Sequence, residues 1–138
     1  VLLIPSFSIG RTQTLLFAIR ELEDKGKIPH VAVYMDSPMA IRATQVFEER
    51  IQSLNLTARK LFLQGKKIFH PQNLHVCKTR EESKAINQVK EKAIIISASG
   101  MATGGRILHH LIQRLPERRD TVLFIGYQAQ GTRGRTIL

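Results

Sequence analysis

Cysteine, aromatic residues and long apolar runs are all scarce in this sequence of 138 residues. The single cysteine, Cys77, has no partner for an internal disulfide and cannot form a thiolate cluster for zinc, which fits a reducing cytoplasm. No apolar run approaches the ~18 to 20 residues that a membrane-spanning helix needs. We therefore expect a cytoplasmic protein with no membrane segment.

Acidic residues are few beside the basic ones. Lys and Arg number 21 against 11 Asp and Glu, so the net charge is +10. No acid lies between Glu49 and Glu81, where seven basic residues occur, and the only charged residues after Asp120 are Arg133 and Arg135. An excess of this size favours an anionic partner, and nucleic acid is expected ahead of a membrane surface.

Apolar residues are nonetheless sufficient for a folded domain. They make up 43% of the chain and the mean hydropathy is −0.11, which argues against disorder. A chain of this length buries roughly two-thirds of the surface that it exposes when unfolded, enough for a single domain over residues 1–138. The chain has no initiator Met, and a last element starts near Thr132 and stops, so we expect one domain excised from a longer polypeptide.

Short apolar runs alternate with helical stretches along the chain. Their nearly continuous apolar character is typical of strands that are buried on both faces, as in a parallel sheet covered by helices. The predicted strands span residues 1–4, 31–35, 74–77, 93–98 and 121–125. The pattern predicts an α/β fold, a doubly wound and mainly parallel five-stranded sheet with helices on both faces, in a three-layer, Rossmann-like arrangement.

Start signals precede several of the predicted helices. Ser37 offers a capping oxygen and is followed by proline at the first helical position. Thr79 forms a capping box with Glu82. Further helices are predicted over residues 103–115, where a proline follows, and from Thr132 onward.

Apolar residues spaced three and four apart give each long helix one buried face. The predicted buried positions are Leu15, Leu16, Ile19 and Leu22; Met39, Ala43, Val46, Phe47, Ile51 and Leu54; and Ile107, Leu108, Leu111, Ile112 and Leu115. Residues 58–73 have the weakest pattern. They are predicted to continue the second helix, turn at Gly65 and pack Phe69 back onto the sheet.

Glycine and small hydroxyl residues concentrate in the segments that follow the predicted strands. These segments are residues 6–11, 36–38, 97–106 and 126–135, and three of them contain arginine. Ligands of open parallel sheets bind beyond the carboxyl ends of the strands, where helix N-termini present free N–H groups. Glycine lets the backbone approach a phosphate, hydroxyls donate to its oxygens and arginine binds it bidentately. An alternative interpretation is that these segments are only the caps and tight turns of an ordinary α/β fold.

No standard catalytic or nucleotide-binding motif is present. The chain lacks G-x-x-x-x-G-K-[ST], a G-x-G-x-x-G after a strand, G-x-S-x-G and S-x-x-K. Its five histidines are not spaced for a metal ion, since the adjacent His109 and His110 point about 100° apart on a helix. We expect His110 to flank the core, His109 to face the loops and Cys77 to be a small core residue. The sequence therefore contains no self-sufficient catalytic site.

Aromatic residues make up only 6% of the chain, and Phe7 and Tyr127 are the two that occur in the candidate loops. This scarcity argues against a platform that stacks bases. It favours recognition of a nucleic-acid backbone through charge and shape.

Four motifs in a compatible order carry a resemblance to a known family. They are PSFSIGRTQTLL at 5–16, DSPMA at 36–40, ISASGMATGGRIL at 96–108 and GYQAQGTRGR at 126–135. Together they closely resemble the β-CASP domain of RNA-processing metallo-β-lactamases. That group includes ribonuclease J and the endonuclease subunit of the cleavage and polyadenylation machinery.

The resemblance implies that this domain is inserted into a metallo-β-lactamase domain, caps its active site and grips single-stranded RNA in the cleft between the two. It also implies two zinc ions, which activate the water that attacks the scissile phosphate. Their ligands in the family, an H-x-H-x-D-H motif and later histidines, are absent from this sequence. We therefore expect no cofactor in this chain, and we expect the chain by itself to be inactive.

The residues that match the family's motifs are assigned together to shaping the cleft and to phosphate contact. They are Ser8, Gly10, Arg11, Gln13, Asp36, Ser37, Ser99, Gly100, Thr103, Gly104, Arg106, Gln128, Gly131, Thr132 and Arg133. Arg11 and Asp36 have a second interpretation, in which they bridge loops within the domain.

Three functional hypotheses follow from the sequence. The leading one is an RNA-binding cap domain of a zinc-dependent ribonuclease, with its own metallo-β-lactamase domain as partner. The alternative is a stand-alone α/β binding protein or enzyme for a phosphorylated small molecule, which would use the same loops and helix dipoles. A third class, a protein interaction module, has no support beyond the exposed basic faces.

Overall fold

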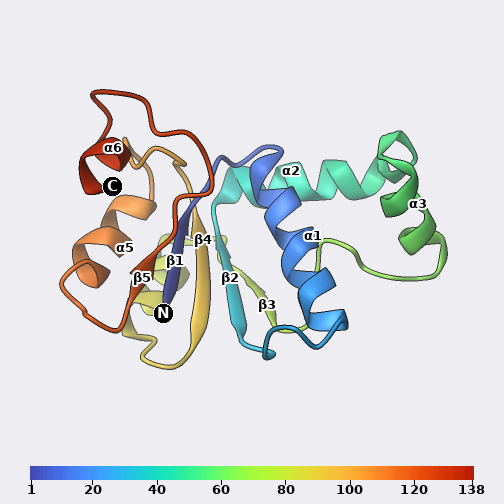
Figure 1. The fold of residues 1–138 in the computed structure, drawn as a ribbon, viewed down its shortest axis with the longest axis horizontal. Coiled ribbons are helices and arrows are strands. Elements are labelled where there is room, and N and C mark those ends of the chain that lie inside the picture. The colour runs from blue at the N-terminus through green and yellow to red at the C-terminus, as the bar shows by residue number, and fades with distance from the viewer.

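Five parallel strands form one sheet at the centre of the computed structural model, which describes residues 1–138 (Figure 1). The strands are β1 (Leu2–Pro5), β2 (Ala32–Asp36), β3 (Leu74–Val76), β4 (Ala93–Ser97) and β5 (Thr121–Val122). Their order across the sheet is β3-β2-β4-β1-β5, and every neighbouring pair is parallel. The predicted doubly wound α/β fold is confirmed.

Helices connect the strands and cover both faces of the sheet (Figure 1). The α-helices are α1 (Arg11–Asp24), α2 (Pro38–Glu49), α3 (Leu56–Leu63), α4 (Arg80–Ala85), α5 (Ile107–Arg114) and α6 (Arg133–Ile137). Two short 3₁₀ helices, η1 (Ile51–Ser53) and η2 (Ile86–Gln88), follow α2 and α4. The core residues place α1, α2 and α3 on one face and η2 and α5 on the other. None of these helices combines the length and the apolar character that crossing a membrane requires.

Strand β4 is the centre of the sheet and is buried along its whole length. It pairs with β1 on one side and with β2 on the other. Side chains alternate across a strand, so Ile94 and Ile96 join the core on one face while Ile95 joins the core on the other. This two-sided burial explains why the segment reads as a continuous apolar run rather than an alternating one.

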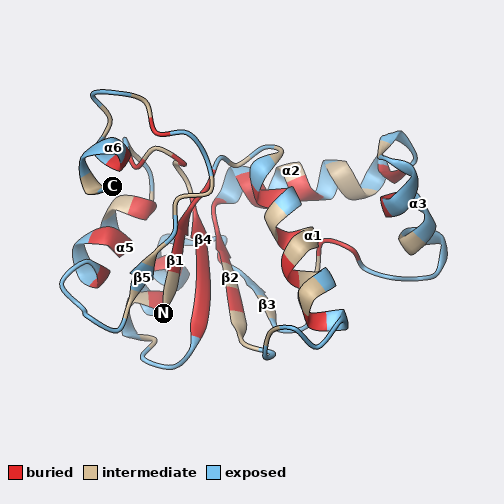
Figure 2. Cartoon of the chain, viewed as in Figure 1, coloured by how far each residue is buried: buried red, intermediate tan, exposed pale blue.

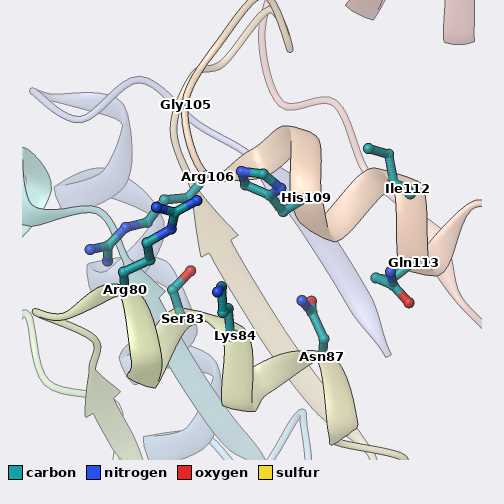
Figure 3. Close-up of a pocket in the computed structure, with 9 residues that line it drawn as sticks. All are labelled: Arg80, Ser83, Lys84, Asn87, Gly105, Arg106, His109, Ile112 and Gln113. Atoms are coloured by element: carbon teal, nitrogen blue, oxygen red, sulfur yellow. The ribbon is translucent and has the colours of Figure 1, made fainter.

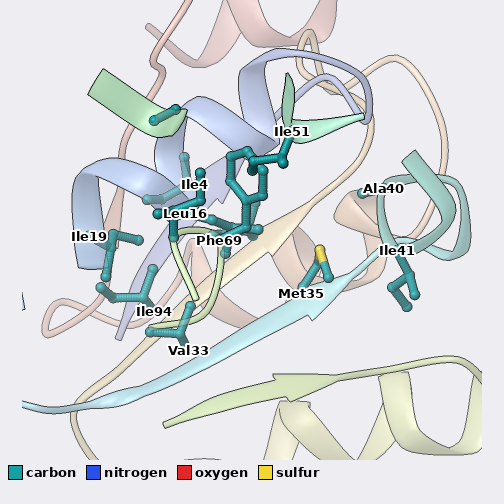
Figure 4. Close-up of a cluster of buried hydrophobic side chains, with 13 residues drawn as sticks. Ile4, Leu16, Ile19, Val33, Met35, Ala40, Ile41, Ile51, Phe69 and Ile94 are labelled. Carbon is teal, nitrogen blue, oxygen red and sulfur yellow. The ribbon is translucent and has the colours of Figure 1, made fainter. Parts of the chain in front are cut away.

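The larger of the two core clusters packs α1 and α2 onto the sheet (Figures 2 and 4). Leu16 and Ile19, three residues apart on α1, belong to this cluster together with Ile4 of β1. Full burial of one such side chain stabilises the fold by about 1.5–3 kcal/mol. Phe69 joins the same cluster and meets Phe47 edge to face, with ring centroids 6.1 Å apart, so the prediction that Phe69 packs back onto the sheet is confirmed.

The smaller cluster fills the opposite face of the sheet and holds α5 through Ile107 and Leu111. Cys77 lies in this cluster and is 5% exposed, which confirms it as a core residue. Burial raises the pKa of the Cys77 thiol to about 12, and the nearby Asp36 carboxylate adds to the shift. The thiol is therefore protonated and unreactive at neutral pH.

The predicted helix starts at Ser37, Thr79 and Thr132 are confirmed. Ser37 Oγ accepts a hydrogen bond from Ala40 N at 3.2 Å, with proline at the first helical position. Thr79 Oγ1 accepts from Glu82 N at 3.1 Å and Glu82 Oε2 accepts from Thr79 N at 2.9 Å, which completes the capping box. The side chain of Thr132 caps α6 in the same way as Ser37 caps α2.

The helix predicted over residues 103–115 begins later, at Ile107, because residues 98–106 form turns and bends. Ile112 is 68% exposed and Leu115 is 49% exposed, so the prediction that both are buried was wrong. The residues that α5 does bury are Ile107, His110, Leu111 and Arg114. Two of these are polar, and they are buried because each has hydrogen-bond partners in the interior, which an apolar pattern does not detect.

The second predicted helix is divided into separate elements. α2 ends at Glu49, and α3 is a new helix because Asn55 Oδ1 accepts a hydrogen bond from the N–H of Ala58 at 2.9 Å and caps it. Met39 and Val46 were predicted to be buried, but they are 62% and 54% exposed, since α2 faces the sheet through its other side.

Strand β5 is shorter than the predicted strand over residues 121–125. It pairs with β1 through Thr121 and Val122, and one more bond joins Leu123 N to Leu3 O at 2.9 Å. The next bond in this parallel ladder would need a backbone N–H from Pro5, which proline lacks. The chain therefore leaves the sheet at this point.

Candidate functional site

The carboxyl ends of all five strands lie at one edge of the sheet, because the strands are parallel. Figure 1 shows this edge at the top, where the loops after β4 and β5 lie near α6 and the loop after β1 leads to α1 beside the start of α2. We call the loop residues 6–10, 36–37, 98–106 and 123–132 the carboxyl edge. All the residues that the motifs single out lie in it or in the first turns of α1 and α6.

Gln13 fixes the loop after β1 and is 1% exposed. Its Oε1 accepts from Gly10 N at 2.7 Å, and its Nε2 donates to Ser8 O at 3.1 Å and to Thr44 Oγ1 of α2 at 2.9 Å. The Ser8 and Ser37 hydroxyls lie 3.0 Å apart and join this loop to the start of α2. The amide of Gln13 is used inside the protein and shapes the loop rather than facing solvent.

Asp36 is the fully buried centre of a second network. Its Oδ1 accepts from Arg106 Nη1 at 2.7 Å, and its Oδ2 accepts from Ser83 Oγ at 2.6 Å and lies 2.6 Å from His110 Nε2. Burial raises the pKa of Asp36, but the hydrogen bonds from His110, Ser83 and Arg106 outweigh it and hold this pKa below its ordinary value. The carboxylate is therefore ionised at neutral pH.

Arg106 links three elements at this edge. Besides its bond to Asp36, Nη1 donates to Cys77 O at 2.9 Å and Nη2 donates to Lys78 O at 3.1 Å. The end of β2, the loop after β3 and the start of α5 are thus tied together. These contacts agree with the interpretation in which Asp36 bridges loops, and they leave Arg106 little free hydrogen-bonding capacity for a ligand.

The loop after β4 is folded tightly on itself. Ser99 Oγ accepts from Thr103 N at 3.2 Å and lies 3.2 Å from Thr103 Oγ1, while Gly104 O accepts from Ser99 N at 3.1 Å. A Cβ atom on Gly100 would lie 2.7 Å from the ring of Phe7 and 2.9 Å from its backbone nitrogen. Glycine at 100 is thus required by the close approach of the loop after β1.

The loop after β5 is fastened to the loop after β4 by Gln128, which is 3% exposed. Its Nε2 donates to Gly100 O at 3.0 Å and to Gly126 O at 3.1 Å. A backbone bond of 2.9 Å from Gly134 N to Met101 O holds α6 against the same loop. Gly131 and Thr132, which precede α6, lie at the turn into this helix.

Three exposed arginines, Arg11, Arg133 and Arg135, make no ion pair and no side-chain hydrogen bond within the chain. Arg11 begins α1, and the other two lie on α6. Among the residues of the carboxyl edge the one acid is Asp36, and Arg106 neutralises it. The edge therefore presents a positive surface over polar loops.

The chemical groups at the carboxyl edge are suited to binding an anion. No group of three or more His, Cys, Asp or Glu side chains is placed to hold a metal ion. The Asp36 and His110 pair is fully buried, so neither side chain can touch a substrate. What the edge offers is cationic side chains, hydroxyls and backbone groups, which are the usual partners of a phosphate backbone.

Sequence reasoning missed the roles of His110 and Ser83. His110 was expected to flank the core, whereas it is fully buried and lies 2.8 Å from Asn87 Oδ1 as well as against Asp36. One feature of the sequence could have indicated the contact between His110 and Asp36. An aspartate at the end of a buried strand needs partners, and Arg106 and His110 are four residues apart on one side of a helix.

Comparison with known protein families identifies the family to which this parallel α/β domain belongs. The model of the Beta-Casp domain matches residues 12–137. The chain therefore belongs to the Beta-Casp domain family, and the resemblance inferred from its motifs is confirmed.

Individual relatives agree with this assignment. Ribonuclease TTHA0252 of Thermus thermophilus is 37% identical over 136 residues, which cover 99% of this chain and 31% of that protein. Transcription termination factor FttA of Methanosarcina mazei is 34% identical over 138 residues, covering 99% and 22%. An RNase J-like protein of Methanocaldococcus jannaschii is 35% identical over 135 residues, covering 98% and 30%. The chain thus spans less than a third of the length of each of these relatives.

Proposed function

We propose that this chain is the RNA-binding cap domain of a cytoplasmic, zinc-dependent ribonuclease and that single-stranded RNA lies across its carboxyl edge. The observation that carries the proposal is the set of exposed, unpaired arginines Arg11, Arg133 and Arg135 above loops whose one acid is neutralised. A phosphate backbone would gain contacts there without displacing an existing ion pair. The ribonuclease and RNase J-like names of two relatives support RNA as the partner.

The zinc ions of such an enzyme do not fit the residues of this chain, because no suitable ligand cluster is present. We propose that they are bound by a metallo-β-lactamase domain elsewhere in the polypeptide and that the carboxyl edge faces this domain. Four large apolar side chains at or beside the edge are exposed, namely Phe7, Ile9, Met39 and Tyr127. Such a group is typical of a surface that another domain covers, which supports the proposal.

Salt dependence of RNA binding tests the proposed function. Fluorescently labelled single-stranded RNA is titrated with this chain at several salt concentrations, and the logarithm of the affinity is plotted against that of the salt concentration. Each phosphate contact contributes about −0.7 to the slope for a single strand, so contacts from the three arginines predict a slope near −2. No binding at low salt, or an affinity that salt does not change, would contradict the proposal.

A further inference from the structure

A groove of about 630 Å³ lies between α4 and α5, on the face of the sheet opposite α1 (Figure 3). Its walls are two helical stripes that face each other. Ser83, Lys84 and Asn87 follow Arg80 along α4 and η2 at the spacing that puts side chains on one side of a helix. The other wall is formed by Arg106, which precedes α5, and by three residues of α5, namely His109, Ile112 and Gln113. The volume is within the range of sites that hold a ligand the size of a nucleotide.

Positive charge dominates the groove. No acidic residue lines it, and Arg80 and Lys84 are exposed without an ion pair or a side-chain hydrogen bond in the chain. Of the two acids on α4, Glu82 is turned toward the backbone N–H groups of Lys78 and Thr79, and Glu81 is exposed but does not line the groove. Two unpaired cations four residues apart form a surface that attracts a phosphate group.

The other end of the groove has a different chemistry. Ile112 is 68% exposed there, with the exposed imidazole of His109 one helical turn before it. Gln113 on α5 and Asn87 on η2 bring amide groups to this part of the groove (Figure 3). An exposed apolar side chain beside an imidazole, with amide groups nearby, suits a nucleobase, which packs against the first two and hydrogen-bonds to the amides.

The groove also opens at the carboxyl edge. Arg80 is the first residue of α4, and Arg106 immediately precedes α5. Both helices start where parallel strands end, so the phosphate-attracting end of the groove adjoins the loops described above. Gly105 lines this opening and is held in place by the loop after β4, since a Cβ there would lie 2.5 Å from Ala98 O.

We propose that the groove between α4 and α5 is a second RNA-binding site, which holds one nucleotide of a strand that continues from the carboxyl edge. Arg80 and Lys84 bind its phosphate, and the base lies against His109 and Ile112. The proposal shares its ligand class with the proposed function but uses none of the three arginines on which that function rests.

The test compares two double charge reversals in this chain. Arg80→Glu with Lys84→Glu changes the groove, whereas Arg59→Glu with Lys60→Glu makes the same change in charge on exposed positions of α3. Glutamate at position 80 is compatible with folding, because an acid in the first turn of a helix is favourable. We expect the groove variant to lose about tenfold in affinity for labelled single-stranded RNA, with a salt slope shallower by about 0.7, because one phosphate contact is lost. The α3 variant should change the affinity by less than about threefold.

A titration of the ¹⁵N-labelled chain with uridine 5′-monophosphate tests whether a free nucleotide binds in the groove and, with the RNA measurements, whether RNA uses the same site. Shifts of amide resonances in residues 80–87 and 105–113, together with the loss of RNA affinity in the groove variant, are the expected result. Equal effects of the two double variants would overturn the proposal, and so would nucleotide shifts without any loss of RNA affinity. Loss of RNA binding in Arg11 and Arg133 variants alone would overturn the groove site while leaving the proposed function in place.

Discussion

Asp36 keeps a negative charge in the interior because donors surround both of its oxygens. A buried ion pair of this kind contributes little by itself, but removing one partner leaves the others without compensation. The cluster therefore makes the positions of β2, α4 and α5 depend on one side chain.

We predict that Asp36→Asn lowers the free energy of unfolding by about 3 kcal/mol, because Arg106 and His110 lose the charge that they surround. Urea unfolding followed by circular dichroism measures this loss. Asp24→Asn is the control, since Asp24 forms exposed ion pairs with Arg20 and Lys66 and its loss should change stability very little. Equal losses in the two variants would mean that burial of the Asp36 network has no energetic consequence.

The lowered pKa of Asp36 predicts how the free energy of unfolding depends on pH. The folded protein holds the pKa of Asp36 below its ordinary value of 3.8, so in acid the unfolded chain binds more protons than the folded one. The stabilisation is complete above about pH 5 and declines as the pH falls through 3.8 toward the folded-state pKa. Unfolding curves recorded between about pH 2 and 7 should show a smaller decline for Asp36→Asn than for the unchanged chain. Equal declines in stability for the two proteins would contradict the inference that Asp36 causes this pH dependence.

At the scale of the element, the loop after β4 depends on the absence of a side chain at one glycine. Gly100 and Gly104 lie in the same loop, but a Cβ at 100 would overlap Phe7, whereas one at 104 has nothing within 4 Å. We predict that Gly100→Ala costs about 1–3 kcal/mol of stability and that Gly104→Ala costs less than about 1 kcal/mol. Thermal unfolding of both variants provides the measurement. A larger loss from Gly104→Ala would show that this loop packs differently.

The elements themselves could largely be predicted from the sequence. Continuous apolar runs predicted the parallel strands, and hydroxyl caps such as Thr79 predicted where helices begin, because both signals act over a few neighbouring residues. The end of β5 is set by the missing N–H of Pro5, a residue of the neighbouring strand β1. It could not be predicted from the residues of β5 alone. The buried face of α5 could not be predicted, because His110 and Arg114 are buried by partners distant in sequence.

The candidate site was predictable in its place but not in its contacts. Parallel strands bring their following loops to one edge, so the gathering of these segments follows from fold class alone. Which polar side chains stay free depends on three-dimensional packing. Gln13 and Gln128 are used to fasten loops, and Arg106 is used to hold Asp36, whereas Arg133 remains exposed.

At the scale of the molecule, the +10 charge of the chain is divided among distinct surfaces. We predict that Arg11→Ala with Arg133→Ala weakens binding of single-stranded RNA about tenfold and makes the salt slope shallower by about 1.4, since two phosphate contacts are lost. Fluorescence anisotropy at two or more salt concentrations measures both quantities. Arg59→Ala with Lys60→Ala is the control for net charge and should have a much smaller effect. The same loss in both double variants would indicate binding through overall charge and not through the carboxyl edge.

The lengths of the strands across the sheet bear on how the molecule behaves in a crowded solution. β4 and β2 at the centre have five residues each, whereas the two outer strands, β3 and β5, have three and two. An outer strand exposes unpaired backbone groups to which another chain can add, and a strand this short offers few of them. We therefore expect the sheet to resist extension by a further strand and the domain to withstand high concentrations without forming fibrillar aggregates.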